Sequence, residues 1–341
     1  MNDRILFILK YRQGSDGRPV QSYGGYFSSG LYWSARFVVD MLNNSGVETK
    51  LVQVTDNNDI DREVFNYRPS TVIIEALWVV PEKFDILKKL HPNVRWTVRL
   101  HSNIPFLANE GMAISWIKGY ASRGVQIGVN SERAYDDVWS LLGPEASDDA
   151  VVYLPNYYPV KPVSKVRYPQ TRVVRIGCYG AIRPMKNQLL QAIAAIRYAD
   201  EQEQILHFHI NGTRVEMGGE PILKNLQALF KGTRHSLVED TWMSRYEFLE
   251  RLRHLDLGLQ VSLSETFCIT AADMVNVGLP LVASSEVPWA IHSCKADPTD
   301  GKAITRRIKK ALTFNRIGVI LNRRELKSYS ERSKYEWLCN F

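Results

Sequence analysis

The sequence predicts an α/β protein built from two domains, each with a parallel sheet. Its 341 residues suit two domains of about 150 residues each. Short apolar strands alternate with helices in both halves of the chain, which is typical of βαβ units. A stretch rich in proline, residues 155–171, interrupts the alternation once. We therefore expect an N-terminal domain (1–158), a linker (159–171), a C-terminal domain (172–325) and a closing segment (326–341).

The N-terminal half begins with a buried strand at residues 5–9 and continues as a regular alternation. Runs of apolar residues with strand or helix periodicity define the later elements. The predicted strands are residues 5–9, 48–54, 71–76, 95–100 and 126–129. The predicted helices are residues 32–43, 61–66, 81–90, 114–122 and 132–142.

The alternation restarts after the linker and gives a second set of elements. The predicted strands are residues 173–179, 205–211 and 257–261. The predicted helices are residues 186–199, 222–230 and 246–252. Because ligands of open parallel sheets bind beyond the carboxyl ends of the strands, we expect the functional residues just after strands.

The composition excludes several classes of protein. Hydrophobic residues make up 45% and charged residues 23%, as in ordinary soluble globular proteins. No apolar run approaches the roughly 18–20 residues that cross a bilayer, and residues 1–9 lack the pattern of a secretory signal. The four cysteines are scattered without a CxxC pair, which favours a reduced protein over a disulfide framework or zinc site. We expect a cytoplasmic location.

The net charge of +7 is concentrated late in the chain. Residues 1–160 hold 16 Lys/Arg and 18 Asp/Glu, whereas residues 161–341 hold 27 and 18. Many of the late cations lie between residues 302 and 327. They fit either a solvated helix face with diphosphate-binding residues, or a surface for a polyanion.

The segment 264–273 carries two acidic residues, Glu265 and Asp273, eight positions apart. It follows the apolar strand 257–261 and precedes an apolar run at 278–283. At about 3.6 residues per turn, this spacing predicts two carboxylates on one helix face. Carboxylates there suit the hydroxyls of a sugar and a ribose, beside N–H groups that can face a phosphate.

A second segment, residues 177–187, places Gly180, Arg183 and Lys186 between a strand and a helix. A helix entry already favours an anion, and two fixed cations there could neutralise a diphosphate without a metal. The alternative is a plain β–turn–α junction with two surface cations. The Asp59-Ile60-Asp61 triplet precedes a helix and is interpreted as capping rather than as a metal site.

These two segments, in this order and spacing, resemble the family-4 retaining glycosyltransferases of the GT-B fold. The resemblance implies two Rossmann-like domains facing a central cleft, with a final helix crossing back to the N-terminal domain. It also implies catalysis without a metal or other cofactor. The aromatic tail 329–341 suits such a crossover helix. The chain is also similar to glycosyltransferases carried by bacteriophages.

The resemblance assigns roles to the residues of both segments. Arg183 and Lys186 bind the donor diphosphate, Glu265 contacts the sugar, and Asp273 stands where the family has a Glu for the ribose. The expected catalytic residues are Glu265, Arg183, Lys186 and His101. The expected donor-binding residues are Gly180, Arg183, Lys186, Glu265, Thr266, Phe267, Cys268, Ile269, Asp273 and Trp242.

Three of the expected positions have equally ordinary structural alternatives. His101 follows the strand 95–100 and matches a family position near the donor sugar, although a lone histidine is often structural. Gly24 and Gly25 resemble the family's glycine-rich loop that borders the cleft, or form a plain flexible loop. Trp242 could flank the nucleobase or belong to a core.

We therefore expect a glycosyltransferase that moves a sugar from a nucleotide-sugar donor, UDP-sugar by default, to a hydroxyl acceptor. The acceptor is either a hydroxymethylated base in double-stranded phage DNA, with the host cytoplasm as location, or a saccharide or lipid-linked glycan. The acidic N-terminal half argues against stable membrane association. The alternative of another class is a catalytically silent nucleotide-sugar or DNA-binding protein.

Overall fold

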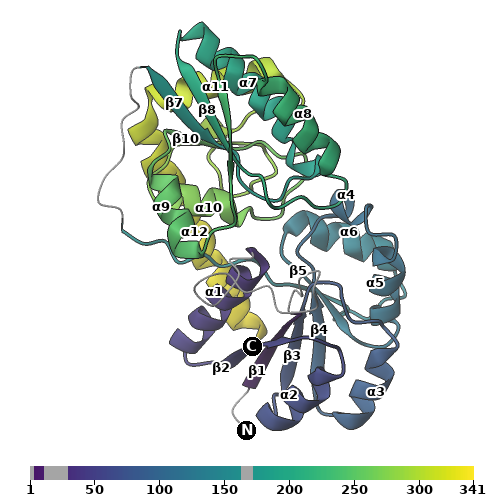
Figure 1. Cartoon of the computed structure of the whole chain (residues 1–341). Coiled ribbons are helices and arrows are strands. Elements are labelled where there is room, and N and C mark those ends of the chain that lie inside the picture. The colour runs from purple at the N-terminus through teal and green to yellow at the C-terminus, as the bar shows by residue number, and fades with distance from the viewer. Residues whose placement is uncertain (1–3, 11–29, 163–171) are drawn as a thin grey trace. The chain divides into compact units, whose positions relative to one another are not determined.

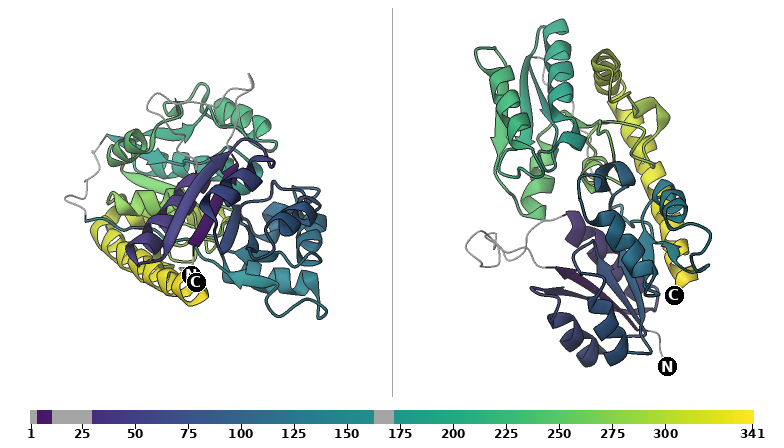
Figure 2. Two further views of the ribbon diagram at one scale, coloured as in Figure 1. Left: turned by 90° about the horizontal axis from the view of Figure 1, so that it is seen from below. Right: turned by 90° about the vertical axis from the view of Figure 1, so that its right-hand side faces the viewer.

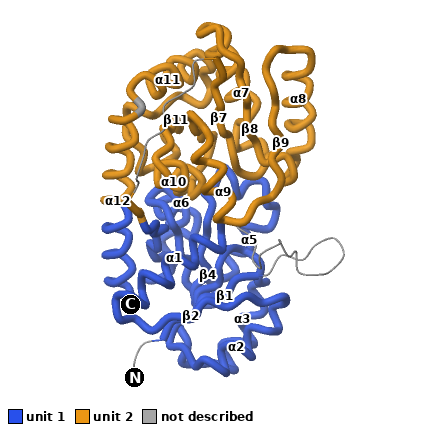
Figure 3. The backbone as a smooth tube through the Cα atoms, turned by 60° about the vertical axis from the view of Figure 1, so that its left-hand side comes forward, with its two compact units in different colours: residues 1–21, 29–159, 329–341 blue, residues 22–28, 160–328 orange. Residues whose placement is uncertain are grey.

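The computed structural model describes residues 4–10, 30–162 and 172–341. These residues form two compact units, each with its own parallel sheet (Figures 1 and 3). Unit 1 comprises residues 4–10, 30–159 and 329–341, and unit 2 comprises 160–162 and 172–328. The loop that holds Gly24 and Gly25 lies outside the described residues.

Unit 1 is a six-stranded parallel sheet with strand order β2-β1-β3-β4-β5-β6. Its strands are β1 (Arg4–Lys10), β2 (Glu48–Val54), β3 (Thr71–Glu75), β4 (Arg95–Arg99), β5 (Gln126–Val129) and β6 (Val151–Tyr153). Its helices are α1 (Gly30–Asn44), α2 (Asp59–Tyr67), α3 (Lys83–Leu90), α4 (Ile104–Leu107), α5 (Ala113–Ala121) and α6 (Glu132–Leu142).

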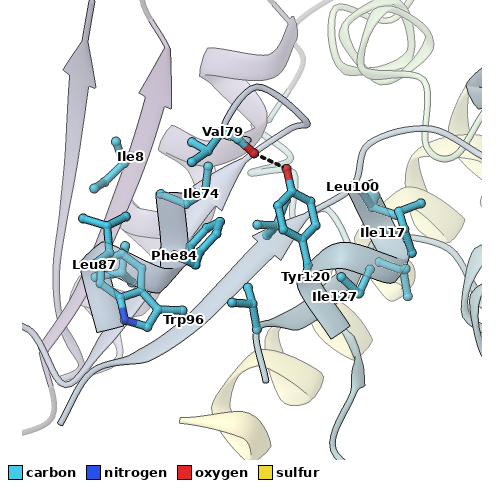
Figure 4. Packing of buried hydrophobic residues seen from close by; sticks show 14 of the residues in the cluster. Ile8, Ile74, Val79, Phe84, Leu87, Trp96, Leu100, Ile117, Tyr120 and Ile127 are labelled. Atoms are coloured by element: carbon cyan, nitrogen blue, oxygen red, sulfur yellow. Dashed lines mark hydrogen bonds between the residues drawn. The ribbon is translucent and has the colours of Figure 1, made fainter. Parts of the chain in front are cut away.

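Strand β1 explains why unit 1 has two apolar layers. Because successive side chains of a strand point to opposite faces, Ile5 and Phe7 pack in one cluster and Leu6 and Ile8 in another. The first cluster includes residues of α1 and Trp337. The second contains the buried faces of α2, α3, α5 and α6, and Figure 4 shows part of it. A strand buried on both faces has the continuous apolar sequence that predicts it.

Unit 2 is a five-stranded parallel sheet with strand order β11-β10-β7-β8-β9. Its strands are β7 (Val173–Gly177), β8 (Ile205–Asn211), β9 (Ser236–Asp240), β10 (Leu257–Gln260) and β11 (Leu281–Ala283). Its helices are α7 (Gln188–Glu201), α8 (Glu220–Phe230), α9 (Arg245–Arg253), α10 (Ile269–Asn276), α11 (Gly301–Thr313) and the first part of α12 (Asn315–Asn340). Two short 3-10 turns, Pro184–Lys186 and His292–Cys294, complete it.

The order of the strands in unit 2 reverses direction at β7 and β10. From β7 the chain continues to β8 and β9 on one side, and from β10 it continues to β11 on the other. The two strands pair in parallel, with Gly258 opposite Gly177. The segments that leave their carboxyl ends therefore start side by side, which is where open α/β sheets bind ligands.

Helix α12 is the long yellow ribbon at the end of the chain (Figures 1 and 2). Its last residues belong to unit 1, where Trp337 is fully buried. The Trp337 ring lies 5.7 Å from the ring of Phe7, and its Nε1 donates a hydrogen bond to the carbonyl of Pro155 at 2.7 Å. Among the described residues, no helix combines the length and hydropathy that crossing a bilayer requires.

Candidate functional site

Three hydrogen bonds join the segment after β10 to residues 185–191, which follow the loop after β7. Asn187 Nδ2 donates to the carbonyl of Val261 at 3.1 Å, and the Val261 N–H donates to Gln191 Oε1 at 2.8 Å. The Leu263 N–H donates to the carbonyl of Met185 at 2.9 Å. These bonds fix the position of one loop against the other at the end of the sheet.

The loops bring Lys186 and Glu265 together as a nearly buried ion pair. Lys186 Nζ contacts Glu265 Oε1, and each side chain is about one-tenth exposed. Ser262 Oγ donates to the same carboxylate oxygen at 2.9 Å. The neighbouring Ser264 Oγ is buried without a hydrogen-bond partner among the described residues. Two of the predicted site residues, 79 positions apart, are thus in direct contact.

Gly180 lets the loop after β7 pass close to Lys186. Its φ is +124°, a conformation that side chains with a Cβ rarely adopt. A Cβ built there would lie 3.6 Å from Lys186 Cε, so the glycine and the lysine stem are neighbours. The structure therefore gives a local reason for a glycine at this position.

Glu265 and Asp273 do not lie on one helix face, and this part of the prediction is wrong. Helix α10 begins at Ile269, because Cys268 just before it has a left-handed backbone with φ +62°. Glu265 therefore lies in the loop, while Asp273 lies within the helix. The prediction extended the helix back to residue 265, four residues before it begins.

Asp273 has its own cation, Arg245. The Arg245 guanidinium donates to both carboxylate oxygens, with one Nη1–Oδ2 distance of 3.1 Å. Both side chains are largely buried. Arg245 is the first residue of α9, whose Ser244 and Glu247 form a capping box. The sequence prediction missed Arg245, although the Ser-x-x-Glu pattern that starts its helix is visible in the sequence.

The segment 266–268 closes the turn between Glu265 and α10. Thr266, Phe267 and Cys268 are buried, and Trp289 Nε1 donates to the Phe267 carbonyl at 2.8 Å. Cys268 Sγ lies 3.3 Å from Gln260 Oε1. Burial and the nearby Glu265 carboxylate raise the pKa of the Cys268 thiol to about 12, so it stays protonated at neutral pH. The neutral thiol packs at the helix start, and the donor-binding role expected of residue 268 stays a prediction.

Arg183 belongs to a chain of charges that leads to Trp242. Arg183 Nη1 lies 3.9 Å from Glu216 Oε2, and Arg214 Nε lies 2.8 Å from Glu216 Oε1. The Arg214 guanidinium lies over the Trp242 ring at 5.0 Å from its centre. Trp242 thus has a cation as a neighbour, and its place beside the nucleobase stays a prediction. Glu216 and Arg214 were not predicted, because nothing in the sequence spacing links them to residue 183.

A second polar cluster joins the ends of β7, β8 and β9. Asp240 Oδ2 accepts from Tyr179 Oη at 2.6 Å and contacts His209 Nδ1 at 3.1 Å, while Arg251 contacts Oδ1 at 3.1 Å. Burial alone would raise the pKa of Asp240, but His209, Tyr179 and Arg251 hold it below its usual value. The cluster joins the end of β9 to β8, to the segment after β7 and to α9.

His101 lies in unit 1 over a buried charge network. Its Nε2 contacts Glu75 Oε2, and the other oxygen of Glu75 accepts from Arg99 Nη1 at 3.2 Å. Burial lowers the pKa of His101, although Glu75 opposes the shift. Arg99 also donates to Asn156 Oδ1 at 2.7 Å. The contact with Glu75 gives His101 a structural role, which was the alternative to a role at the donor sugar. The role at the donor sugar stays a prediction.

Asp59 and Asp61 bind groups outside helix α2, and the expectation that they cap it is wrong, because its N-cap residue is Asn58 and no side-chain cap bond forms. Asp59 Oδ2 accepts from the backbone N–H of Thr55 and Asp56, and Asp61 pairs with His91 at 2.7 Å. Within residues 4–10, 30–162 and 172–341, no group of three His, Cys, Asp or Glu side chains could hold a metal ion.

Comparison with known proteins identifies the fold. No family model matches the sequence, and no curated protein sequence matches it significantly. Anabaena HepE in complex with UDP-glucose is similar in structure over 99% of this chain and 100% of HepE, with a TM-score of 0.65 and 9% identity. The sucrose-phosphate synthase of Thermosynechococcus elongatus matches over 98% and 97%, with a TM-score of 0.66 and 12% identity.

A third similar structure is that of TarM from S. aureus, in complex with UDP. It matches with a TM-score of 0.60 and 12% identity, over 79% of this chain, which spans only 54% of TarM's length. At these identities the likeness establishes the fold alone. The prediction of a GT-B fold with two Rossmann-like α/β domains is confirmed.

Proposed function

We propose that this protein is a glycosyltransferase that takes its sugar from a nucleotide-sugar donor. The observation that carries the proposal is the contact between Lys186 and Glu265 at the carboxyl ends of β7 and β10. These two strands flank the point where the order of the sheet reverses, which is the usual ligand site of such sheets. The solved structures of similar fold that contain UDP or UDP-glucose favour this class of donor.

In the proposed reaction, Lys186 and Arg183 bind the donor diphosphate and stabilise the charge that develops as it leaves. Glu265 then accepts hydrogen bonds from hydroxyls of the sugar. In the structure each charge of the pair neutralises the other. A diphosphate and a sugar would supply Lys186 and Glu265 with separate partners. We further propose that the transfer retains the anomeric configuration and needs no metal.

The nucleoside part of the donor is assigned to neighbouring residues. Asp273, held by Arg245, is proposed to contact the ribose. Trp242, with Arg214 over its ring, is proposed to flank the base. Backbone N–H groups at the start of α10, near Phe267–Ile269, are proposed to face the diphosphate. UDP is the proposed nucleotide.

The acceptor is proposed to be a hydroxyl group, either of a hydroxymethylated base in DNA or of a saccharide. Mass spectrometry of nucleosides from hydroxymethylated DNA, incubated with the protein and UDP-sugars, separates the two. A mass shift of one sugar per modified base identifies DNA as the acceptor. An unshifted base, with product formed from a saccharide panel, identifies the saccharide.

The site assignment is tested by substitutions at its two charged residues. Lys186→Met and Glu265→Gln should each lower kcat/KM for UDP-glucose, measured as release of UDP, by about 100-fold or more. Lys186→Met should also raise the KM for the donor, because the lysine binds the diphosphate in the ground state. Lys231→Met, which changes an exposed lysine of the same unit, is the matched control and should keep full activity.

Calorimetric binding of UDP to the unaltered protein, together with the activity assay, separates an enzyme from a silent binder. If UDP binds and no sugar is released from any donor, the chain is a nucleotide-sugar-binding protein. If both variants keep full activity and cooperative thermal unfolding, the proposed site is wrong.

A further inference from the structure

Helix α11 and the start of α12 carry a concentrated positive charge. Residues 301–328 contain nine Lys or Arg and one acidic residue, Glu325. Two of the arginines are used within unit 2, since Arg307 donates to the Ser293 carbonyl at 2.6 Å and Arg323 to the Asn276 carbonyl at 2.7 Å. Lys309, Lys310, Arg316 and Arg324 are exposed, and no carboxylate of the described chain lies within ion-pair distance of them.

The same segment exposes large apolar side chains. Phe314 is 63% exposed, Ile317 61%, Ile320 56% and Leu321 41%. The opposite side of this part of α12 is buried through Val319, Asn322 and Leu326. Because residues three or four positions apart share a helix face, Ile317, Ile320, Leu321 and Arg324 lie on the outer face.

We define the basic apolar face as the following residues: Lys309, Lys310, Phe314, Arg316, Ile317, Ile320, Leu321 and Arg324. Its cations and its apolar side chains alternate along the sequence from the end of α11 into α12, and all of them are exposed. An outward stripe of this kind is costly in water, and monomeric proteins rarely keep such contiguous apolar patches without a partner.

We propose that the basic apolar face binds the surface of an anionic lipid bilayer. Lipid phosphates would meet the lysine and arginine head groups, and the aliphatic side chains would enter the boundary between head groups and acyl chains. A bilayer supplies both anionic charge and apolar depth. A second copy of this face would present the same positive charge, and duplex DNA offers phosphates but no apolar partner for Ile317 or Ile320.

This proposal replaces the expectation of no stable membrane association. That expectation rested on the acidic charge of the N-terminal half. The exposure of the aliphatic residues of α12 is a property of the folded chain that a charge count does not show. The proposed association is peripheral and independent of the transferase activity.

Vesicle co-sedimentation tests the proposal directly. The full chain should bind phosphatidylcholine vesicles that contain phosphatidylglycerol, should leave vesicles of phosphatidylcholine alone unbound, and should bind less as salt increases. The paired substitution Ile317→Ser and Ile320→Ser should weaken binding by about tenfold without a change in charge. Lys309→Gln with Lys310→Gln should weaken it similarly and reduce its dependence on salt.

Matched controls change similar residues elsewhere. Phe65→Ser removes an apolar side chain that is 66% exposed on α2, and Lys224→Gln with Lys231→Gln removes two exposed cations of unit 2. Both should bind vesicles like the unaltered chain. Thermal unfolding of every variant checks that the fold is kept.

Three results would overturn the proposal. The first is no binding to anionic vesicles. The second is full vesicle binding by the Ile317/Ile320 variant, together with duplex DNA that both this variant and the unaltered chain shift equally in gels. That result would identify a general polyanion surface. The third is a dimer in sedimentation equilibrium that this variant converts to monomer, which would identify an interface between copies.

Discussion

The two acidic residues eight positions apart have different partners. Glu265 contacts Lys186 and Ser262, whereas Asp273 is held through both oxygens by Arg245. Residue 273 is an aspartate, which is one methylene shorter than the glutamate of the resembled family. Its carboxylate is held in place by Arg245. The arginine therefore fixes the carboxylate that the sequence prediction assigned to the ribose.

The Arg245–Asp273 pair should contribute strongly to the stability of unit 2. Asp273→Ala or Arg245→Ala should each lower the free energy of unfolding by about 3 kcal/mol, because each leaves a largely buried charge without its partner. The double variant should lose much less than the sum of the two. Urea denaturation measures all three, and additive losses would contradict the pair. The exposed Arg62–Asp59 pair is the control and should show little coupling.

The buried network under His101 should make the stability of unit 1 depend on pH. Burial would raise the pKa of Glu75, but the Arg99 and His101 charges outweigh it and hold that pKa below 4.5. The unfolded chain therefore binds a proton more readily. The contribution of Glu75 to stability is complete above pH 4.5 and is lost as pH falls through the lower, folded-state pKa.

Glu75→Gln should lower the free energy of unfolding at neutral pH by about 3–5 kcal/mol, because it leaves Arg99 buried without its carboxylate. It should also flatten the loss of stability in acid. Denaturation curves between neutral pH and pH 3 measure both effects. Glu48→Gln, at an exposed ion pair with Arg4, is the control and should change little. An unchanged acid profile in Glu75→Gln would contradict the assignment.

At the scale of elements, the sequence predicted most strands, including the edge strand β2. The predicted ranges 48–54, 126–129 and 205–211 coincide with β2, β5 and β8. The strands β6, β9 and β11 were not predicted, and all three are edge strands of their sheets. Only one residue of β9, Asp240, is buried, so its sequence lacks the apolar run that marks a buried strand.

Element starts depend on single backbone angles that the sequence does not reveal. The helix predicted at 186–199 begins at Gln188, after a 3-10 turn and after Asn187 with φ +56°. Helix α10 begins at Ile269 for a similar reason. These angles keep both residues off the α-helices, so that Lys186 in its 3-10 turn meets Glu265 in its loop.

The segment before α8 should tolerate no side chain at Gly219. A Cβ there would lie 2.0 Å from the carbonyl oxygen of Ile182, which accepts a hydrogen bond from the Glu216 N–H. Gly219→Ala should therefore shift the segment that precedes Arg183 and lower the free energy of unfolding by about 1–3 kcal/mol. Gly111→Ala, where a Cβ would meet nothing within 4 Å, is the control. Equal stability of the two variants would contradict the close approach.

At the scale of the whole molecule, two α/β domains were predictable because their strands are apolar and regularly spaced. The site was predictable where its residues lie in the segments that connect such strands to the next helix, as Lys186 and Glu265 do. Arg245, Glu216 and Arg99 were not predictable, since their roles depend on contacts between segments far apart in the sequence. The exposure of Ile317 and Ile320 likewise follows from the fold and not from local pattern.

The C-terminal residues should be needed for the stability of unit 1. Trp337 is fully buried beside Phe7 and donates to the Pro155 carbonyl. Trp337→Ala should lower the free energy of unfolding by about 3–5 kcal/mol, because it leaves a large cavity. The adjacent Leu338→Ala, at a side chain 36% exposed, should cost far less. Equal losses from the two changes, measured by urea denaturation, would contradict this packing.

The membership of residues 329–341 in unit 1 has a consequence for synthesis on the ribosome. Strand β1 emerges before unit 2, but the Trp337 indole that packs against it emerges after residues 172–328 of unit 2. The apolar layer of unit 1 therefore stays incomplete until unit 2 has been translated. Unit 1 is completed after unit 2, contrary to the usual order of folding from the N-terminus.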